Sequence, residues 1–228
     1  VGGSVFLDIS KFPSYGKLSK LNTSQMIQKA KNFDEDLENP GKKHPLDVTL
    51  WREKELNQEK HIPSFPSPFG AGRPGWHIEC SAIAMSTLGE RIDIHGGGID
   101  LIFPHHSAEI IQSEGATGKT PFVKKWMHTG VVFYKEEKMS KSKGNLVLVS
   151  DLLKKYSANA IRWLLLSHHY SKSWEFKEKD LVKAQKCVDL VESAIANKTG
   201  NSQLDIKKFT KLMNQDLNTP LVLKLLLE

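Results

Sequence analysis

A dense run of prolines and glycines between residues 63 and 75 most limits how this 228-residue chain can fold. Its breaking residues are Pro63, Pro66, Pro68, Gly70, Gly72, Pro74 and Gly75. Proline removes a backbone donor and glycine weakens regular structure, so no long helix or central strand is expected to cross the run. We therefore predict a boundary here, with a polar, irregular module over residues 1–69 before it.

The residues after this run alternate between strand-like and helix-like patterns. We predict, in order, a helix over 76–85, a strand over 91–95 ended by Gly96–Gly98, a helix from Pro104 to about Glu114 with its stop at Gly115, and a strand over 126–133. Such alternation is typical of an α/β domain with a largely parallel sheet. From Val149 onward the pattern predicts an α-helical region, with helices over 149–156, 158–168, 181–196, 209–217 and 221–228.

Composition limits the class of protein. Charged residues make up 25% of the chain and hydrophobic residues 39%, which is ordinary for a soluble globular protein. No apolar run approaches the roughly 20 residues of a membrane helix, so we expect no membrane contact. Two cysteines argue against a disulfide framework and favour a reducing, cytoplasmic compartment. The formal charge of +6 suits a polyanionic partner such as RNA.

Cys80, His105 and Glu109 form a candidate zinc site. His105 and Glu109 are four residues apart on a predicted helix and share one face, whereas Cys80 lies on another helical segment. Three zinc-binding side chains with one open position describe a working rather than a structural site. The alternative is a buried cysteine beside a surface His–Glu hydrogen bond, and the spacing alone favours this plainer interpretation.

A glycine turn at Gly96–Gly98, between His95 and Asp100, is a second candidate. Glycines after a strand let a ligand approach the backbone closely, and open α/β sheets bind ligands at the carboxyl ends of their strands. Asp100 would then hold an amine or a ribose hydroxyl. A simple strand-to-helix turn explains the glycines equally well.

The third candidate is the cationic loop Lys138–Ser142. Lys138 and Lys141 alternate there with the small hydroxyls Ser140 and Ser142. Such a loop can close over a polyphosphate and offset the charge that develops in phosphoryl chemistry. The plain alternative is a solvated basic turn.

Taken together, these segments resemble the cysteinyl-tRNA synthetases, which are class I aminoacyl-tRNA synthetases. The loop has their KMSKS signature, and the other similar stretches are 3–18, 67–81, 93–106, 158–165 and 216–220. The resemblance implies the second half of a Rossmann-like catalytic domain with an insertion module, followed by an α-helical region. Its segments would be the insertion module at 1–69, the nucleotide-binding half-domain at 70–135, the signature loop and tRNA stem contact at 136–178, and the start of a helical bundle at 179–228.

The resemblance also implies roles for the candidate residues. Cys80, His105 and Glu109 become zinc ligands, and the open position takes the thiolate of the substrate L-cysteine. Trp76 becomes a wall of the cysteine pocket, and His95 and Asp100 help to position the substrate or its adenylate.

ATP with magnesium is the implied cofactor of the loop. Lys141 becomes the main phosphate contact with Lys138 in support, and Ser140, Ser142 and Gly96–Gly98 complete the ATP site. The implied reaction joins L-cysteine to tRNA(Cys) through cysteinyl-adenylate, and we expect a monomeric enzyme.

Two features of the family are absent from this sequence. Its N-terminal half carries a further cysteine ligand and a His-x-Gly-His signature, and neither occurs here near the candidate residues. We therefore expect a central piece that is inactive by itself. Two alternatives remain: the related cysteine ligase of mycothiol biosynthesis, which attaches cysteine to an aminosugar, and a non-catalytic RNA-binding or zinc module. The long helical region favours the tRNA enzyme.

Overall fold

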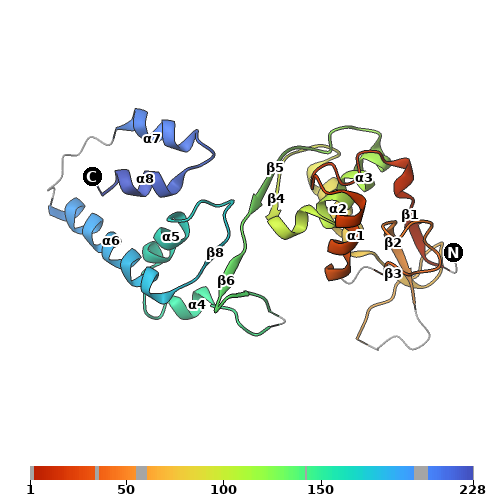
Figure 1. The fold of residues 1–228 in the computed structure, drawn as a ribbon, viewed down its shortest axis with the longest axis horizontal. Coiled ribbons are helices and arrows are strands. Elements are labelled where there is room, and N and C mark those ends of the chain that lie inside the picture. The colour runs from red at the N-terminus through yellow and green to blue at the C-terminus, as the bar shows by residue number, and fades with distance from the viewer. Residues whose placement is uncertain (1–2, 34–35, 55–60, 142, 198–204, 228) are drawn as a thin grey trace. The chain divides into compact units, whose positions relative to one another are not determined.

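The computed structural model describes residues 3–33, 36–54, 61–141, 143–197 and 205–227. Its contacts divide the chain into two compact units, Val1–Met127 and His128–Glu228 (Figure 1). Each unit has its own buried hydrophobic cluster. These packing units do not test the four segments predicted from the sequence, which stay a prediction.

A three-stranded antiparallel sheet begins the first unit. Its order is β1-β2-β3, with bounds Val5–Leu7, Val48–Glu53 and Gly72–Pro74. Two glycines let β3 lie close to β2, because a Cβ on Gly72 or Gly75 would overlap the backbone carbonyl of Arg52 or Thr49. The proline- and glycine-rich run therefore supplies an edge strand to this sheet.

Helix α1 (Thr23–Ala30) makes residues 1–69 more regular than predicted. Asn22 caps its first turn, with Gln25 bonding back in a capping box. Its inner face buries Met26 in a cluster with Phe103. Short 3-10 helices lie before and after it, η1 (Ile9–Lys11) and η2 (Lys31–Phe33).

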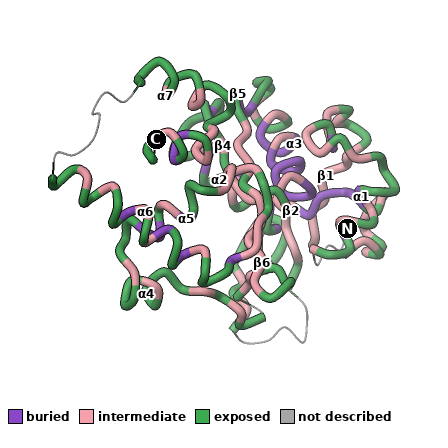
Figure 2. Tube along the Cα trace, turned by 60° about the vertical axis from the view of Figure 1, so that its left-hand side comes forward, coloured by how far each residue is buried: buried purple, intermediate pink, exposed green. Residues whose placement is uncertain are grey.

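Two helices form the centre of the first unit. Helix α2 (Trp76–Leu88) packs against α3 (His105–Thr117). Figure 2 shows α3 as a largely buried stretch of the trace, in agreement with its burial along successive turns. A charged or polar side chain on the inner face of α3 is therefore removed from water, where it needs a partner.

Glycines in this unit play different parts from those predicted. Gly96–Gly98 do not end the strand but belong to β4 (Ile92–Gly98), which pairs with β5 (Val123–Thr129) and continues into η3 (Ile99–Ile102). Gly115 does not stop α3, which ends at Gly118 with φ of 68°. A Cβ on Gly115 would lie 2.8 Å from the ring of Phe12, so close packing accounts for this glycine.

The single strand predicted over 126–133 is two strands. β5 ends at Thr129, β6 begins at Val132, and Gly130 lies between them because a Cβ there would overlap the backbone of Lys172.

The second unit has the sheet order β7-β6-β8, with β6–β7 antiparallel and β6–β8 parallel. The described strands thus form three small sheets and not one largely parallel sheet. The bounds in this sheet are Val132–Tyr134 for β6, Glu137–Lys138 for β7 and Trp174–Glu175 for β8.

The rest of the second unit is helical, as predicted. Helices α5 and α6 bury one cluster that includes Ile161, Leu164 and Leu181. Ser157 and Asn218 cap the starts of α5 and α8. The helix bounds are Val149–Leu152 for α4, Ala158–Leu166 for α5, Glu178–Asn197 for α6, Ile206–Met213 for α7 and Thr219–Leu225 for α8. No helix in the described ranges combines the length and apolar character needed to cross a bilayer.

Candidate metal centre and substrate site

Cys80, His105 and Glu109 converge in the first unit. Cys80 lies in the second turn of α2, and the other two share one face of α3. One ligand atom from each lies within 4.8 Å of the others, and both α3 residues are buried. Their combination of sulfur, imidazole and carboxylate fits zinc with a position left open.

The carboxylate of Glu109 is the feature of this group that best fits a cation. Its side chain is fully buried, with His105 Nε2 lying 2.8 Å from Oε1 and His95 Nε2 lying 3.2 Å from Oε2. Neither carboxylate oxygen accepts a hydrogen bond from a described residue, since these contacts lack hydrogen-bond geometry. A buried carboxylate left in this way is costly unless a cation completes its environment.

His77 orients the ring of His105. The Nδ1 atoms of the two histidines lie 2.8 Å apart, and His77 is buried on the first turn of α2. With Nδ1 occupied in this way, Nε2 of His105 remains directed toward Glu109. A metal-binding histidine usually has its second nitrogen fixed by such a partner.

Cys80 has a thiol that favours the protonated form. Burial raises its pKa above the ordinary value, and the charges of Glu109 and Glu79 raise it further. Since a metal binds the thiolate, a cation at this group would oppose that rise.

Two of the other predicted substrate residues, Trp76 and His95, lie beside the same group. The ring of Trp76 lies 4.8 Å from that of His105, and the Trp76 side chain is 49% exposed. His95 on β4 contacts the second oxygen of Glu109, and with His106 forms another cluster of possible ligand atoms around this carboxylate. Asp100 lies in the first turn of η3.

Close packing explains one of the glycines of β4, apart from any contact with a ligand. A Cβ on Gly97 would lie 2.7 Å from the ring of His106, so this glycine brings β4 close to α3. A Cβ on Gly96 would lie 3.5 Å from its nearest neighbour, the carbonyl oxygen of Met127, which is an ordinary contact distance. Packing therefore does not require a glycine at position 96. Assignment of these glycines to ATP stays a prediction.

The lysine loop begins at Lys138, the last residue of β7, in the second unit. Asn145 holds its base, since its side chain accepts from the Ser140 N–H at 2.9 Å and donates to the Lys138 carbonyl at 3.1 Å. Lys141 is exposed, with no ion pair to any residue in the described ranges. Ser142, which was predicted to contact ATP, lies outside the described residues.

Comparison with known proteins decides the family. The model of the catalytic domain of class I (C) tRNA synthetases matches residues 1–186. The chain belongs to this synthetase family. It is 43% identical over 232 residues to the cysteine–tRNA ligase of Legionella pneumophila (strain Corby), covering 99% of this chain and 49% of that protein. A cysteine–tRNA ligase of Dehalococcoides mccartyi (strain BAV1) is 44% identical over 228 residues, covering 96% of this chain and 48% of its own length.

The synthetase chain spans about half the length of the curated relatives it matches. Sequence reasoning had missed two residues that the site uses for positioning. His77 lies three residues before Cys80, so helical spacing could have placed both on one face of α2. Asn145 could not be found in this way, because its bonds to the loop depend on how the loop folds back on itself.

Proposed function

We propose that the full-length protein joins L-cysteine to tRNA(Cys), using ATP and a cysteinyl-adenylate intermediate. The observation that carries this proposal is the convergence of Cys80 and His105 on the buried carboxylate of Glu109. It occurs in a chain whose curated relatives are cysteine–tRNA ligases. A centre suited to sulfur is the expected means of selecting a substrate whose distinguishing group is a thiol.

Zinc is the metal that we propose for this group, held by Cys80, His105 and Glu109. When bound, zinc supplies a soft Lewis acid that prefers the thiolate of cysteine to the hydroxyl of serine. His77 keeps the His105 ring in place, and Trp76 shields one side of the group from water. Because selection rests on a sulfur ligand, it needs no editing step.

The chemistry requires positioning and charge compensation from the chain. A carboxylate oxygen of cysteine attacks the α-phosphorus of ATP, and pyrophosphate leaves. A hydroxyl of the terminal ribose then attacks the carbonyl carbon, and AMP leaves. We assign the amino acid to His95 and Asp100, and the phosphates of magnesium-bound ATP to Lys141 with Lys138. Ser140, Ser142 and Gly96–Gly98 remain our proposed further contacts to ATP.

Two assays on the full-length protein test this function. Cysteine-dependent ATP–pyrophosphate exchange reports adenylate formation, and cysteinylation of tRNA reports transfer. We expect both, and serine should support neither. Exchange with transfer only to an aminosugar would favour the mycothiol-type ligase, and the absence of both reactions would favour a non-catalytic RNA-binding or zinc module. We also propose that the enzyme is a cytoplasmic monomer, and that these 228 residues alone form no adenylate.

A further inference from the structure

Two arginines lie side by side on neighbouring strands of the N-terminal sheet. Arg52 on β2 lies directly opposite Arg73 on β3 in the strand register. Neither guanidinium forms an ion pair or a hydrogen bond with another residue of the described ranges. Like charges directly opposite each other in an antiparallel pair are destabilising, so folding does not account for this arrangement.

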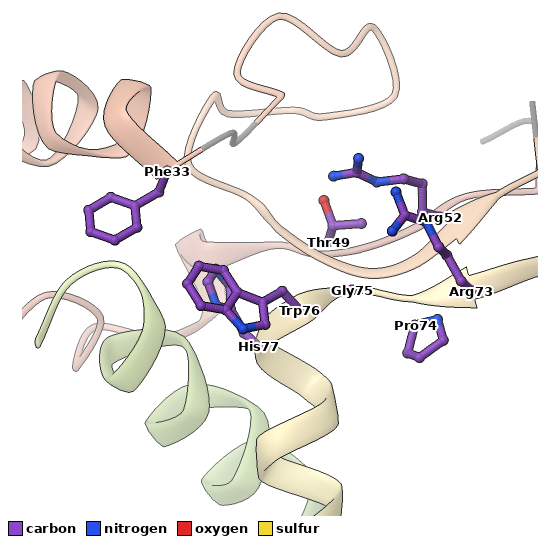
Figure 3. Close-up of a pocket in the computed structure, with 8 residues that line it drawn as sticks. All are labelled: Phe33, Thr49, Arg52, Arg73, Pro74, Gly75, Trp76 and His77. Atoms are coloured by element: carbon purple, nitrogen blue, oxygen red, sulfur yellow. The ribbon is translucent and has the colours of Figure 1, made fainter. Parts of the chain in front are cut away.

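Both arginines line one cavity. Figure 3 shows their side chains leaving the paired strands on the same side, with Thr49 beside them. The cavity has a volume of about 290 Å³, and none of its lining residues is a carboxylate. Its lining is Phe33, Thr49, Arg52, Arg73, Pro74, Gly75, Trp76 and His77. It therefore holds two positive charges without a counter-ion from its own lining, which suits an anionic ligand.

The aromatic residues Phe33 and Trp76, which also line the cavity, indicate which kind of anion it would bind. Trp76 is 49% exposed, and the ring of Phe33 stacks on it with centroids 6.4 Å apart and planes inclined by 27°. Cations that hold phosphates beside aromatic side chains are the usual means of binding single-stranded nucleic acid. Guanidinium groups also match phosphate oxygens with paired donors, which a lysine does not.

The cavity borders the candidate metal centre within the same unit. Trp76 and His77 line the cavity, and their rings lie 4.8 Å and 5.0 Å from that of His105. A group bound in the cavity is thus separated from the metal-binding residues by a single layer of rings.

We propose that Arg52 and Arg73 bind the sugar-phosphate backbone at the 3′ end of the RNA substrate, beside the rings of Phe33 and Trp76. This inference rests on the proposed function. In that function the terminal ribose must reach the carboxyl carbon of an amino acid held beside His105. The phosphate that precedes the ribose is only one sugar away, which fits a cavity one ring away from the metal centre.

Charge-removing substitutions in the full-length protein test the proposal. For the double variant Arg52→Gln/Arg73→Gln, we expect kcat/KM for tRNA cysteinylation to fall at least about tenfold more than the rate of ATP–pyrophosphate exchange. Arg52→Lys/Arg73→Lys keeps both charges and should recover part of this loss. Lys11→Gln removes an exposed cation of the same unit that does not line the cavity, and should change both rates by less than about twofold.

Binding of shortened RNA locates the contact on the substrate. The wild-type protein should bind tRNA without its 3′-terminal CCA more weakly than intact tRNA. The double glutamine variant should bind the two RNAs equally. Its salt dependence for intact tRNA should be shallower by about 0.7 in the log–log slope for each phosphate that the variant no longer neutralises.

The possible contrary results are distinct. Equal losses of exchange and cysteinylation would overturn the proposal in favour of the phosphates of ATP, and no loss of either would exclude an anion site. A continued preference of the double variant for intact tRNA would also overturn it. A wild-type protein that cysteinylates no tRNA would instead reject the proposed function, before any variant is compared.

Discussion

Glu109 is a fully buried carboxylate whose two oxygens accept no hydrogen bond from the described residues. Histidines from two elements nevertheless point a nitrogen at it, His105 from α3 and His95 from β4. Hydrogen bonding among the described residues does not account for this arrangement, whereas a shared cation does. The burial of Glu109 and its lack of hydrogen bonds from the described residues therefore indicate a metal centre more strongly than the types of the three residues alone.

Substitution of Cys80 tests the ligand set. We expect Cys80→Ala in the full-length protein to lower bound zinc, because the group loses its only sulfur among the three residues. Elemental analysis after dialysis measures the zinc. Cys187→Ala is the matched control, since this cysteine lies on α6 outside the group, and it should keep the wild-type content. Unchanged zinc in Cys80→Ala would remove Cys80 from the ligand set.

Lys141 is predicted to stabilise charge on the phosphates. We expect Lys141→Ala to slow adenylate formation at least about tenfold, roughly the effect of removing one charged group that touches the transition state. Single-turnover measurement of adenylate formation is the appropriate assay. Lys143→Ala is the control, because Lys143 already pairs with Glu137 at 3.2 Å and should have a smaller effect. Equal rates for wild type and Lys141→Ala would contradict the assignment.

The residues of the site were predictable to different degrees. His105 and Glu109 could be paired because helical spacing fixes which residues share a face. The opposition of Arg52 and Arg73 could not be predicted, since it depends on the register between β2 and a strand formed within the proline- and glycine-rich run. The contact between His77 and His105 could not be predicted either, because it depends on how two separate helices pack against each other.

At the level of elements, strand β3 depends on the absence of side chains at its ends. We expect Gly75→Ala to destabilise the full-length protein by about 1–3 kcal/mol, since the added methyl would overlap the Thr49 carbonyl. Thermal unfolding of the full-length protein measures this change. Gly96→Ala, whose nearest neighbour lies at 3.5 Å, should unfold close to the wild-type temperature. Equal melting of the two variants would contradict the tight β2–β3 packing.

Helices were easier to predict than sheets. The pattern after Val149 gave each described helix of the second unit to within a few residues, because a helix depends on neighbours in sequence. Strand pairing depends on distant partners, so the largely parallel sheet was wrong. Gly115 was misread because its role comes from Phe12, about a hundred residues earlier in the chain.

At the level of the whole molecule, the metal-binding residues all belong to the unit Val1–Met127. We expect removal of zinc by a chelator to speed amide hydrogen exchange in α2 and α3, because bound metal stabilises only the state that holds it. Helices α5 and α6 belong to the other unit and should keep their exchange rates. Exchange measured by mass spectrometry on the full-length protein gives both values at once. An equal increase in all four helices would contradict a locally acting metal.

The sharing of Glu109 among α2, α3 and β4 also bears on how such a protein can evolve. Losing one partner of a buried charged group leaves the others uncompensated, which is strongly destabilising. Under the proposed function, a lineage that exchanged this centre for another means of choosing its amino acid would have to change Cys80, His95, His105 and Glu109 nearly together. Single-step drift away from this specificity therefore passes through poorly folded intermediates, and the centre resists gradual divergence.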